Sequence, residues 1–195
     1  MAETAATARG RATRQRVLDA ATEEFARYGL AGARVDRIAA NARTNKAQLY
    51  VYFGSKEALF DDVVHESMQH MLSTVPISAD DLADWAVRLY DEYLERPDLI
   101  RLATWARLER RPEGHLRDDA DRLDATKLDV IGAAQRSGEI TAAASAFDVM
   151  AMVIAMSMAW SPVSNVYAAT AREGDGVHAG RREFLRTVVE RAVAP

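Results

Sequence analysis

The stretch from Val35 to Phe53 constrains the fold more than any other part of this sequence. Apolar residues of one helical face recur before and after a four-residue junction: Val35, Ile38, Ala39, Ala42, then Leu49, Tyr50 and Phe53. Two short helices that meet at such a corner predict a helix-turn-helix. An ordinary helical hairpin inside an all-helical core is the alternative, and periodicity alone does not separate the two.

The second of these helices is the candidate for contact with nucleic acid. In a helix-turn-helix this helix enters the DNA major groove with its N-terminal residues on base edges. Here it would span Lys46 to Tyr52, with Leu49 anchoring it inward and Asn45 as its N-cap. The positions predicted to face outward are short or polar: Asn45, Lys46, Ala47, Gln48 and Val51.

The residues of this segment and their order resemble those of a known protein family. The run A-x-T-N-K-A-Q-L-Y-V-Y-F-G-S-K-E-A-L-F resembles the DNA-binding domain of TetR-family transcriptional regulators. The likeness covers the chain from Thr13 to Phe60. Beyond Phe60 the chain resembles the family only in being helical and of about the right length.

The resemblance implies an all-α fold with two domains. An N-terminal three-helix helix-turn-helix DNA-binding domain would be joined to a larger C-terminal helical ligand-binding and dimerisation domain. We expect a mobile arm over residues 1–12, the DNA-binding domain over residues 13–56 and the larger domain over residues 57–195. Thr13 should cap the first helix and Gly29 should end it. Ser78 and Asp98 are the expected caps of two later helices.

The resemblance also assigns roles within the DNA-binding segment. Lys46 and Ala47 match positions that face bases, whereas Gln48, Tyr50, Tyr52 and Lys56 match positions that commonly touch phosphates. With the turn residues, the predicted DNA site comprises Arg43, Thr44, Asn45, Lys46, Ala47, Gln48, Tyr50, Tyr52 and Lys56. For Tyr50 a packing role stays open, because it also belongs to the apolar stripe.

Two residues depart from the family pattern. Ala33 stands where Thr or Ser is usual at the start of the second helix, so that helix should lack a side-chain cap worth about 1 kcal/mol. Arg43 stands in the turn where Gly is usual, and a left-handed residue other than Gly costs about 1–2 kcal/mol. We expect Arg43 to recover this cost only on DNA, where its cation reaches a phosphate or a base edge.

Charge is divided unevenly along the chain. The net charge of −4 alone argues against a nucleic-acid binder, yet residues 1–60 carry ten Lys or Arg and only six Asp or Glu. A basic first third joined to an acidic remainder fits one face that meets phosphates. The chain has no cysteine, which excludes disulfides and thiolate sites and permits a reducing compartment. Because Met1 to Arg14 has no apolar run, we expect a cytoplasmic protein.

The remaining two thirds predict a helical effector and dimer domain. Aromatic and Met residues that suit a flat or apolar ligand lie on the helices that surround the ligand cavity in the family: Trp85, Tyr90, Tyr93, Trp105, Met152 and Met156. Core packing is the alternative for each. The apolar segment Phe147 to Trp160 and a last helix from about Gly180 match the family's four-helix dimer interface: Phe147, Met150, Ile154, Phe184, Leu185, Val188 and Val189.

Catalysis, a metal and a cofactor are not expected. His65 and His70 are five residues apart, so on a helix their imidazoles lie about 140° apart and do not share one face. A membrane span is not expected either, because Phe147 to Trp160 is too short and carries Asp148.

The sequence therefore predicts a ligand-responsive transcriptional regulator, with repression the favoured sign. A homodimer would bind an inverted-repeat operator in double-stranded DNA and be released by an unidentified small hydrophobic or aromatic effector. The alternative is a small-molecule-binding helical dimer whose DNA-binding motif is impaired or requires a co-ligand.

Overall fold

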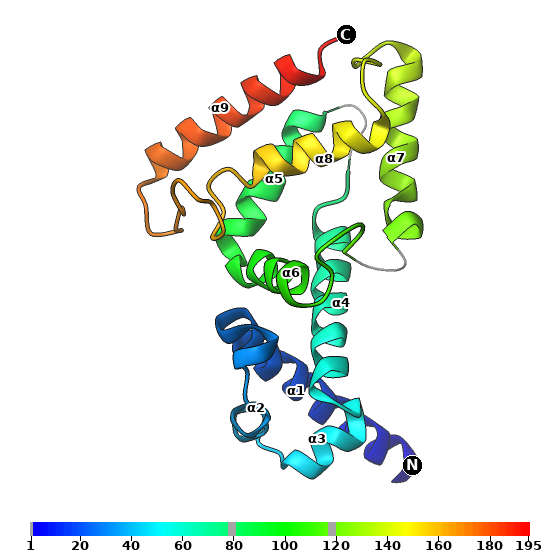
Figure 1. The fold of residues 1–195 in the computed structure, drawn as a ribbon, viewed down its shortest axis with the longest axis vertical. Coiled ribbons are helices and arrows are strands. Elements are labelled where there is room, and N and C mark those ends of the chain that lie inside the picture. The colour runs from blue at the N-terminus through cyan, green and yellow to red at the C-terminus, as the bar shows by residue number, and fades with distance from the viewer. Residues whose placement is uncertain (1, 78–80, 117–119) are drawn as a thin grey trace. The chain divides into compact units, whose positions relative to one another are not determined.

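All regular structure that is described in this chain is helical. The computed structural model describes residues 2–77, 81–116 and 120–195 (Figure 1). The helices within these ranges are α1 (Ala2–Gly32), α2 (Val35–Asn41), α3 (Lys46–Phe53), α4 (Lys56–Thr74), α5 (Leu82–Glu95), α6 (Pro97–Glu109), α7 (Ala120–Ser137), α8 (Ala146–Ser157) and α9 (Asp175–Val193). The all-α prediction is confirmed. None of these helices is long and apolar enough to cross a membrane.

Contacts divide the chain into two compact units. Unit 1 comprises Met1–His70 and Arg101–Gly114, and unit 2 comprises Met71–Ile100 and His115–Pro195. The helices α4 and α6 each have residues in both units. The domain limits at residues 12 and 56 stay a prediction.

The core of unit 1 explains how two very short helices are held in place. Phe25 of α1 and Phe60 of α4 are fully buried and meet edge to face, with ring centroids 5.0 Å apart. Ile38 of α2 and Leu49 of α3 are buried completely as well. Helices of seven and eight residues are unstable alone. Burial of these anchors therefore supplies the stability that α2 and α3 lack.

The first helix begins earlier than the sequence analysis predicts. α1 begins at Ala2, so Thr13 lies inside the helix and is wrong as its cap. The Thr13 hydroxyl donates to the carbonyl oxygen of Arg9, one turn earlier, at 3.0 Å. The segment before Thr13 is rich in Ala, the best helix former, and this propensity outweighs its small apolar surface.

Gly29 interrupts α1 near its end, in keeping with the predicted stop. Its φ of 68° and ψ of −178° are not helical. A Cβ at this position would lie 2.5 Å from Glu109 Oε1 and 2.8 Å from Trp105 Cε3. The Glu109 carboxylate also accepts a hydrogen bond from the Ala31 backbone N–H at 2.8 Å. Residues of α6 thus pack closely against the end of α1, and no side chain would fit at position 29.

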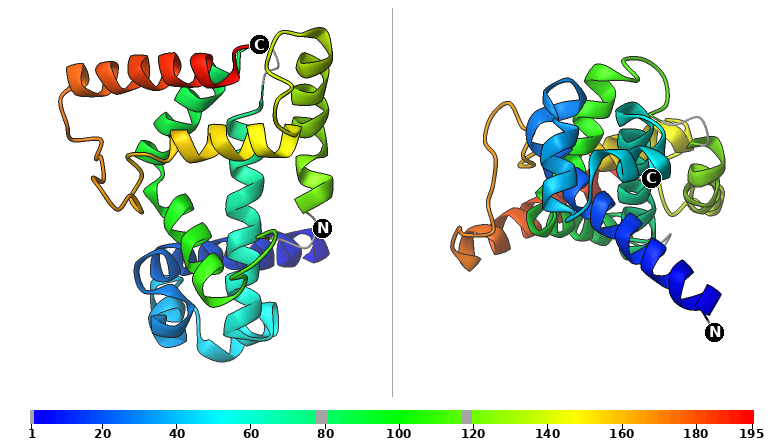
Figure 2. Two further views of the ribbon diagram at one scale, coloured as in Figure 1. Left: turned by 45° about the horizontal axis from the view of Figure 1, so that its top comes forward. Right: turned by 90° about the horizontal axis from the view of Figure 1, so that it is seen from below.

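Unit 2 is built around α5, which contacts both α8 and α9, and α7 packs on α8 (Figures 1 and 2). Its largest fully buried side chains are the rings of Trp85 and Tyr90 on α5. Ile131 of α7, Val153 of α8 and Val189 of α9 close the core around them. The three helices α7, α8 and α9 are therefore held together through one apolar cluster.

Two helix starts in unit 2 differ from the predictions. The cap of α5 is Asp81, whose side chain accepts from the Asp84 backbone N–H at 2.6 Å; the predicted cap Ser78 lies outside the described residues. The helix α6 begins at Pro97, so Asp98 lies in its first turn and is wrong as the cap. Proline favours the first helical position because it has no N–H that would need a partner there.

Candidate nucleic-acid interface

The turn between α2 and α3 is closed by backbone hydrogen bonds. The Thr44 N–H donates to the Ala39 carbonyl oxygen at 3.0 Å, and the Arg43 N–H donates to the Ala40 carbonyl oxygen at 3.1 Å. This pattern is a Schellman motif, whose left-handed position is usually glycine. Arg43 occupies it with a φ of 53°, and within the described ranges no other non-glycine residue has a positive φ. The left-handed conformation predicted for Arg43 is thus present.

The turn sets the start of α3 directly. The Asn45 side chain accepts from the Gln48 N–H at 2.8 Å, which confirms the predicted cap. The Thr44 hydroxyl lies 2.8 Å from the Gln48 side-chain oxygen, so Gln48 is held from both sides of the turn. Leu49 and Phe53 are buried beneath the helix. The opposite face of α3 is consequently turned outward.

Most of the predicted DNA-contact residues lie on this outward face. Those that are exposed are Arg43, Asn45, Lys46, Ala47, Gln48 and Tyr50, whereas Thr44, Tyr52 and Lys56 are half-buried. Val51 is the most exposed apolar residue of the segment, with 83% of its surface accessible. The exposed members of the predicted site therefore lie along the chain from the turn into α3, whose place in the fold Figure 1 shows.

Arg16 of α1 binds the backbone at the end of α2, next to the turn. Its Nε donates to the carbonyl oxygen of Ala42 at 3.2 Å, and its Nη2 donates to the Thr13 hydroxyl at 3.0 Å. The carbonyl of Ala42 belongs to the end of α2, where helix carbonyls lack partners. This role of Arg16 could not be predicted, because nothing in the sequence near the turn indicates a partner on another helix.

The start of α2 is fixed by a buried carboxylate rather than by a local cap. Its N-cap residue is Arg34, one residue later than expected, and no side-chain cap is present, as predicted. Glu24 of α1, only 5% exposed, accepts from the Arg34 N–H at 2.8 Å and from Arg37 at 2.6–3.1 Å. The hydrogen bond to Glu24 raises the pKa of Arg37. Glu24 thereby replaces the missing cap.

The two predicted lysine contacts have protein partners in the structure. Lys56 Nζ donates to the carbonyl oxygen of Ala33 at 3.3 Å. Lys46 Nζ lies 3.3 Å from Asp36 Oδ1 of α2. Each lysine thus spans the gap from its own helix to the start of α2.

The predicted effector residues do not gather in one place. Trp85, Tyr90 and Tyr93 are buried together in the core of unit 2, and Met156 is half-buried against that core. Met152 is 58% exposed on α8, and Trp105 belongs to unit 1. The assignment of these six residues to a ligand site stays a prediction.

Polar groups are buried within this aromatic core. The Tyr90 hydroxyl lies 2.7 Å from His178 Nδ1, and His178 Nε2 lies 3.2 Å from the Thr170 carbonyl oxygen. With Nε2 protonated, the ring donates to Thr170 and accepts from Tyr90. Burial raises the pKa of Tyr93 to about 12. The core of unit 2 therefore offers hydrogen-bonding groups as well as aromatic faces.

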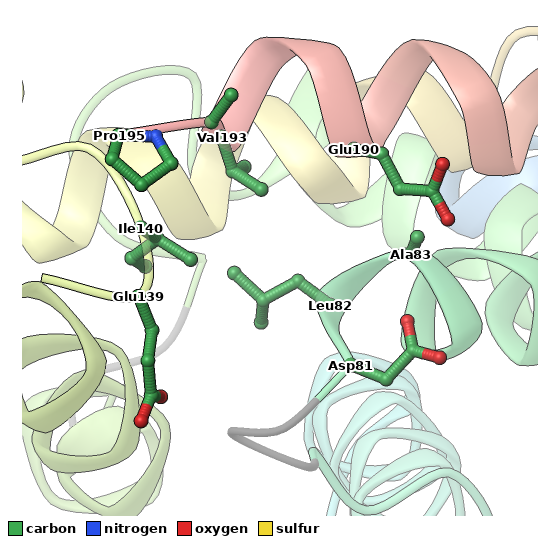
Figure 3. Close-up of a pocket in the computed structure, with 9 residues that line it drawn as sticks. Asp81, Leu82, Ala83, Glu139, Ile140, Glu190, Val193 and Pro195 are labelled. Atoms are coloured by element: carbon green, nitrogen blue, oxygen red, sulfur yellow. The ribbon is translucent and has the colours of Figure 1, made fainter.

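A pocket of about 630 Å³ lies at another place in unit 2 (Figure 3). Leu82, Ile140 and Val193 supply its apolar wall, and the carboxylates of Glu139 and Glu190 stand at its edges (Figure 3). None of the six predicted effector residues lines it. This pocket could not be predicted from the sequence, because its walls come from the start of α5, the loop after α7 and the end of α9.

The predicted dimer residues divide between the inside and the outside of the chain. Met150, Leu185 and Val189 are buried in the core of unit 2, and Ile154 and Val188 are half-buried. Phe147 is 45% exposed and Phe184 is 61% exposed. Both α8 and α9 thus bury one apolar face and present a second one outward.

The described residues hold no group of three or more His, Cys, Asp or Glu that could bind a metal ion.

Comparison with known proteins places both halves of the chain in one group. Residues 17–63 match the family profile of bacterial regulatory proteins of the tetR family, and residues 81–191 match that of the Tetracyclin repressor-like C-terminal domain. The HTH-type transcriptional repressor SCO4008 of Streptomyces coelicolor is 36% identical over 184 residues, which is 93% of this chain and 95% of that protein.

Solved structures agree with these matches. The crystal structure of SCO4942 from Streptomyces coelicolor, a candidate transcriptional regulator, superposes with a TM-score of 0.77 at 38% identity, covering 93% of this chain and 98% of the other. A TetR family transcription regulator from Marinobacter aquaeolei gives a TM-score of 0.73 at 20% identity, covering 96% and 98%, and shows the fold alone.

Proposed function

The chain belongs to the TetR family of bacterial regulatory proteins, and from this premise we propose that it is a homodimeric repressor released by a small-molecule effector. The families and relatives that it matches are transcriptional regulators, which are not enzymes. The proposal adds to this membership an inverted-repeat operator, a dimer and an effector of hydrophobic or aromatic character. Repression is favoured because a relative that shares most of its length with the chain is itself a repressor.

The exposed first turn of α3 is the observation that carries the proposal. Lys46, Ala47 and Gln48 are exposed at the N-terminal end of a helix whose other face is buried. A lysine can donate to guanine O6 or N7, and an alanine methyl can meet a thymine methyl. In a helix-turn-helix it is the N-terminal residues of this helix that read base edges. We therefore assign sequence reading to these three residues.

A dimer is supported by the apolar surface that α8 and α9 leave outside the core. Met152 of α8 and Phe184 of α9 are each more than half exposed. Ala151 and Ala155, one helical turn apart on α8, are exposed beside Met152. Exposed apolar patches on helices mark contact sites, and small residues allow close helix packing. A second copy of the chain would cover these residues with the same pair of helices.

An effector would act by preferring one geometry of the dimer. Unit 2 supplies aromatic faces with buried polar groups, such as Tyr90 beside His178, and this mixture suits a small apolar ligand with few polar atoms. The ligand needs only a differential affinity for the two geometries, typically about 1–3 kcal/mol. Repression would end when the α3 helices of the two subunits no longer match both half-sites.

Selection of bound duplexes from a random DNA library with the ligand-free protein tests the proposal. The expected result is an enriched inverted repeat whose half-sites are about one helical turn apart. Lys46→Ala should reduce the enrichment without abolishing it, because Ala47 and Gln48 remain, whereas the matched control Arg172→Ala, which removes a cation from an exposed loop of unit 2, should leave it unchanged. Absence of enrichment at low salt with and without a ligand library would refute DNA reading.

The second candidate function, a ligand-binding dimer with an impaired motif, has one observation in its favour. Arg43 holds a left-handed conformation that disfavours residues with a Cβ, so the turn is strained in the unbound protein. Salt dependence separates the two functions. Phosphate contacts make log K fall steeply with log salt concentration, whereas an impaired motif shows no binding that salt could weaken.

A further inference from the structure

We propose that Asp36 determines how selectively the protein reads DNA, by holding the Lys46 ammonium toward base edges and away from phosphates. This inference rests on the proposed DNA-binding function and adds a specificity-determining residue to it. Asp36 itself is not among the predicted contacts. It would act through Lys46, as a positioning residue.

Asp36 is an exception in the charge pattern of the segment that contains α2 and α3. From Arg34 to Phe53 the chain carries four cations and a single acidic residue, Asp36. Asp36 lies in the first turn of α2 with 78% of its side chain exposed. Such a charge is costly beside DNA, because it faces the phosphates that the surrounding cations attract.

Lys46 is the cation that Asp36 holds. Its Nζ lies 3.3 Å from Asp36 Oδ1, and its side chain remains 51% exposed. Arg37 follows Asp36 directly in the sequence, but its guanidinium is bound to Glu24 and lies over the Tyr28 ring at 4.4 Å. The pair therefore joins the first turn of α2 to the first residue of α3.

An exposed ion pair of this kind adds little to stability, so its effect is expected in binding. An ammonium group has three donors, and it can contact guanine O6 or N7 while it keeps Asp36 as a partner. If Lys46 turned instead to a phosphate, the Asp36 carboxylate would be left without its partner beside the DNA backbone. Non-specific complexes, which depend on phosphate contacts, are therefore penalised more than the specific complex.

The test compares Asp36→Asn with the wild-type chain on two duplexes, the selected operator and a scrambled duplex of equal length, across a salt series. Asp36→Asn should strengthen binding to the scrambled duplex. The ratio of operator affinity to scrambled-duplex affinity should fall at least about fivefold, the lower end of what one base contact contributes. The salt slope on the scrambled duplex should steepen by about 1, as expected for one additional phosphate contact.

Two further variants separate positioning from a general change of charge. Glu23→Gln makes the same charge change at an exposed position of α1 and should leave the affinity ratio unaltered. Asp36→Glu keeps the carboxylate and should restore most of the ratio. In a Lys46→Ala background, Asp36→Asn should no longer alter the ratio, because the residue through which it acts is gone.

The outcomes distinguish this inference from the proposed function. If the protein selects an operator but Asp36→Asn strengthens both duplexes equally, the carboxylate acts only as bulk charge and the inference is wrong. If Asp36→Asn alters the ratio equally with and without Lys46, the positioning role is wrong. If no operator is selected at all, the DNA-binding function fails and the inference fails with it.

Discussion

Replacement of Arg43 by glycine should stabilise the unbound protein. The residue holds φ at 53° in the turn between α2 and α3, and the two hydrogen bonds that close the turn are made by backbone atoms, which glycine retains. Relief of the left-handed strain contributes about 1–2 kcal/mol, and the greater freedom of glycine in the unfolded chain removes about 0.4–1 kcal/mol of that. The expected net gain is about 0.5–1 kcal/mol, or about 1–4 °C in Tm for a chain of this size.

Urea and thermal unfolding followed by circular dichroism measure this gain, and Arg43→Ala is the matched variant. Alanine loses the charge but keeps the Cβ, so its stability should stay near that of the wild type. Both variants lose the guanidinium, and both should bind the selected operator more weakly with a salt slope reduced by about 1. The difference in stability between the glycine and alanine variants therefore measures the backbone strain. The loss of operator affinity that both variants share measures the contribution of the guanidinium charge.

The strain at Arg43 and the contact of its guanidinium with DNA can be refuted separately. Equal stability of the glycine and alanine variants would show that the left-handed conformation carries no strain that matters. Unchanged operator affinity in both variants would show that the guanidinium does not touch DNA. In that case the strained turn would have no compensation on DNA.

Three further predictions concern other parts of the chain. Glu24→Gln should lower the free energy of unfolding by about 2–3 kcal/mol, because it removes the charged acceptor at the start of α2, and an unchanged urea midpoint would contradict this role. Phe184→Asp should convert the proposed dimer into a monomer in sedimentation velocity; a dimer that persists would place the interface elsewhere. Tyr93, with its pKa raised to about 12, stays protonated in the folded chain while the unfolded chain ionises near 10, so stability falls as pH rises between these values by about 2–3 kcal/mol. Tyr93→Phe should lose less stability between urea titrations at pH 9 and pH 11.5, and an equal loss would refute the burial argument.

Features that depend on neighbouring residues could be predicted from the sequence. The Asn45 cap, the left-handed Arg43 and the buried Leu49 all follow from short-range spacing and from turn chemistry, and the structure has each of them. The α2 helix without a side-chain cap was predictable in the same way. Local rules worked because each of these conformations is set within one or two helical turns.

Features that depend on partners distant in sequence could not be predicted in this way. Glu24 reaches the start of α2 and Arg16 reaches its end, each from α1, and no periodicity indicates which polar residues of a helix will be buried. Trp105 is an aromatic residue of the kind that lines apolar ligand sites, yet it packs in unit 1 beside Gly29. The start of α1 differs from the prediction for another reason, because the helix propensity of the Ala-rich segment outweighs its small apolar surface.

The close packing of α6 against the end of α1 predicts where loss-of-function mutations should occur. Position 29 admits no side chain, since a Cβ there would collide with Glu109 and Trp105 and the backbone conformation disfavours one as well. Every missense change at this codon would therefore disturb the helix that carries Glu24 and Arg16. In a reporter screen for loss of the repression that we propose, we expect alleles at codon 29 to appear beside alleles in α3, although Gly29 reads no base.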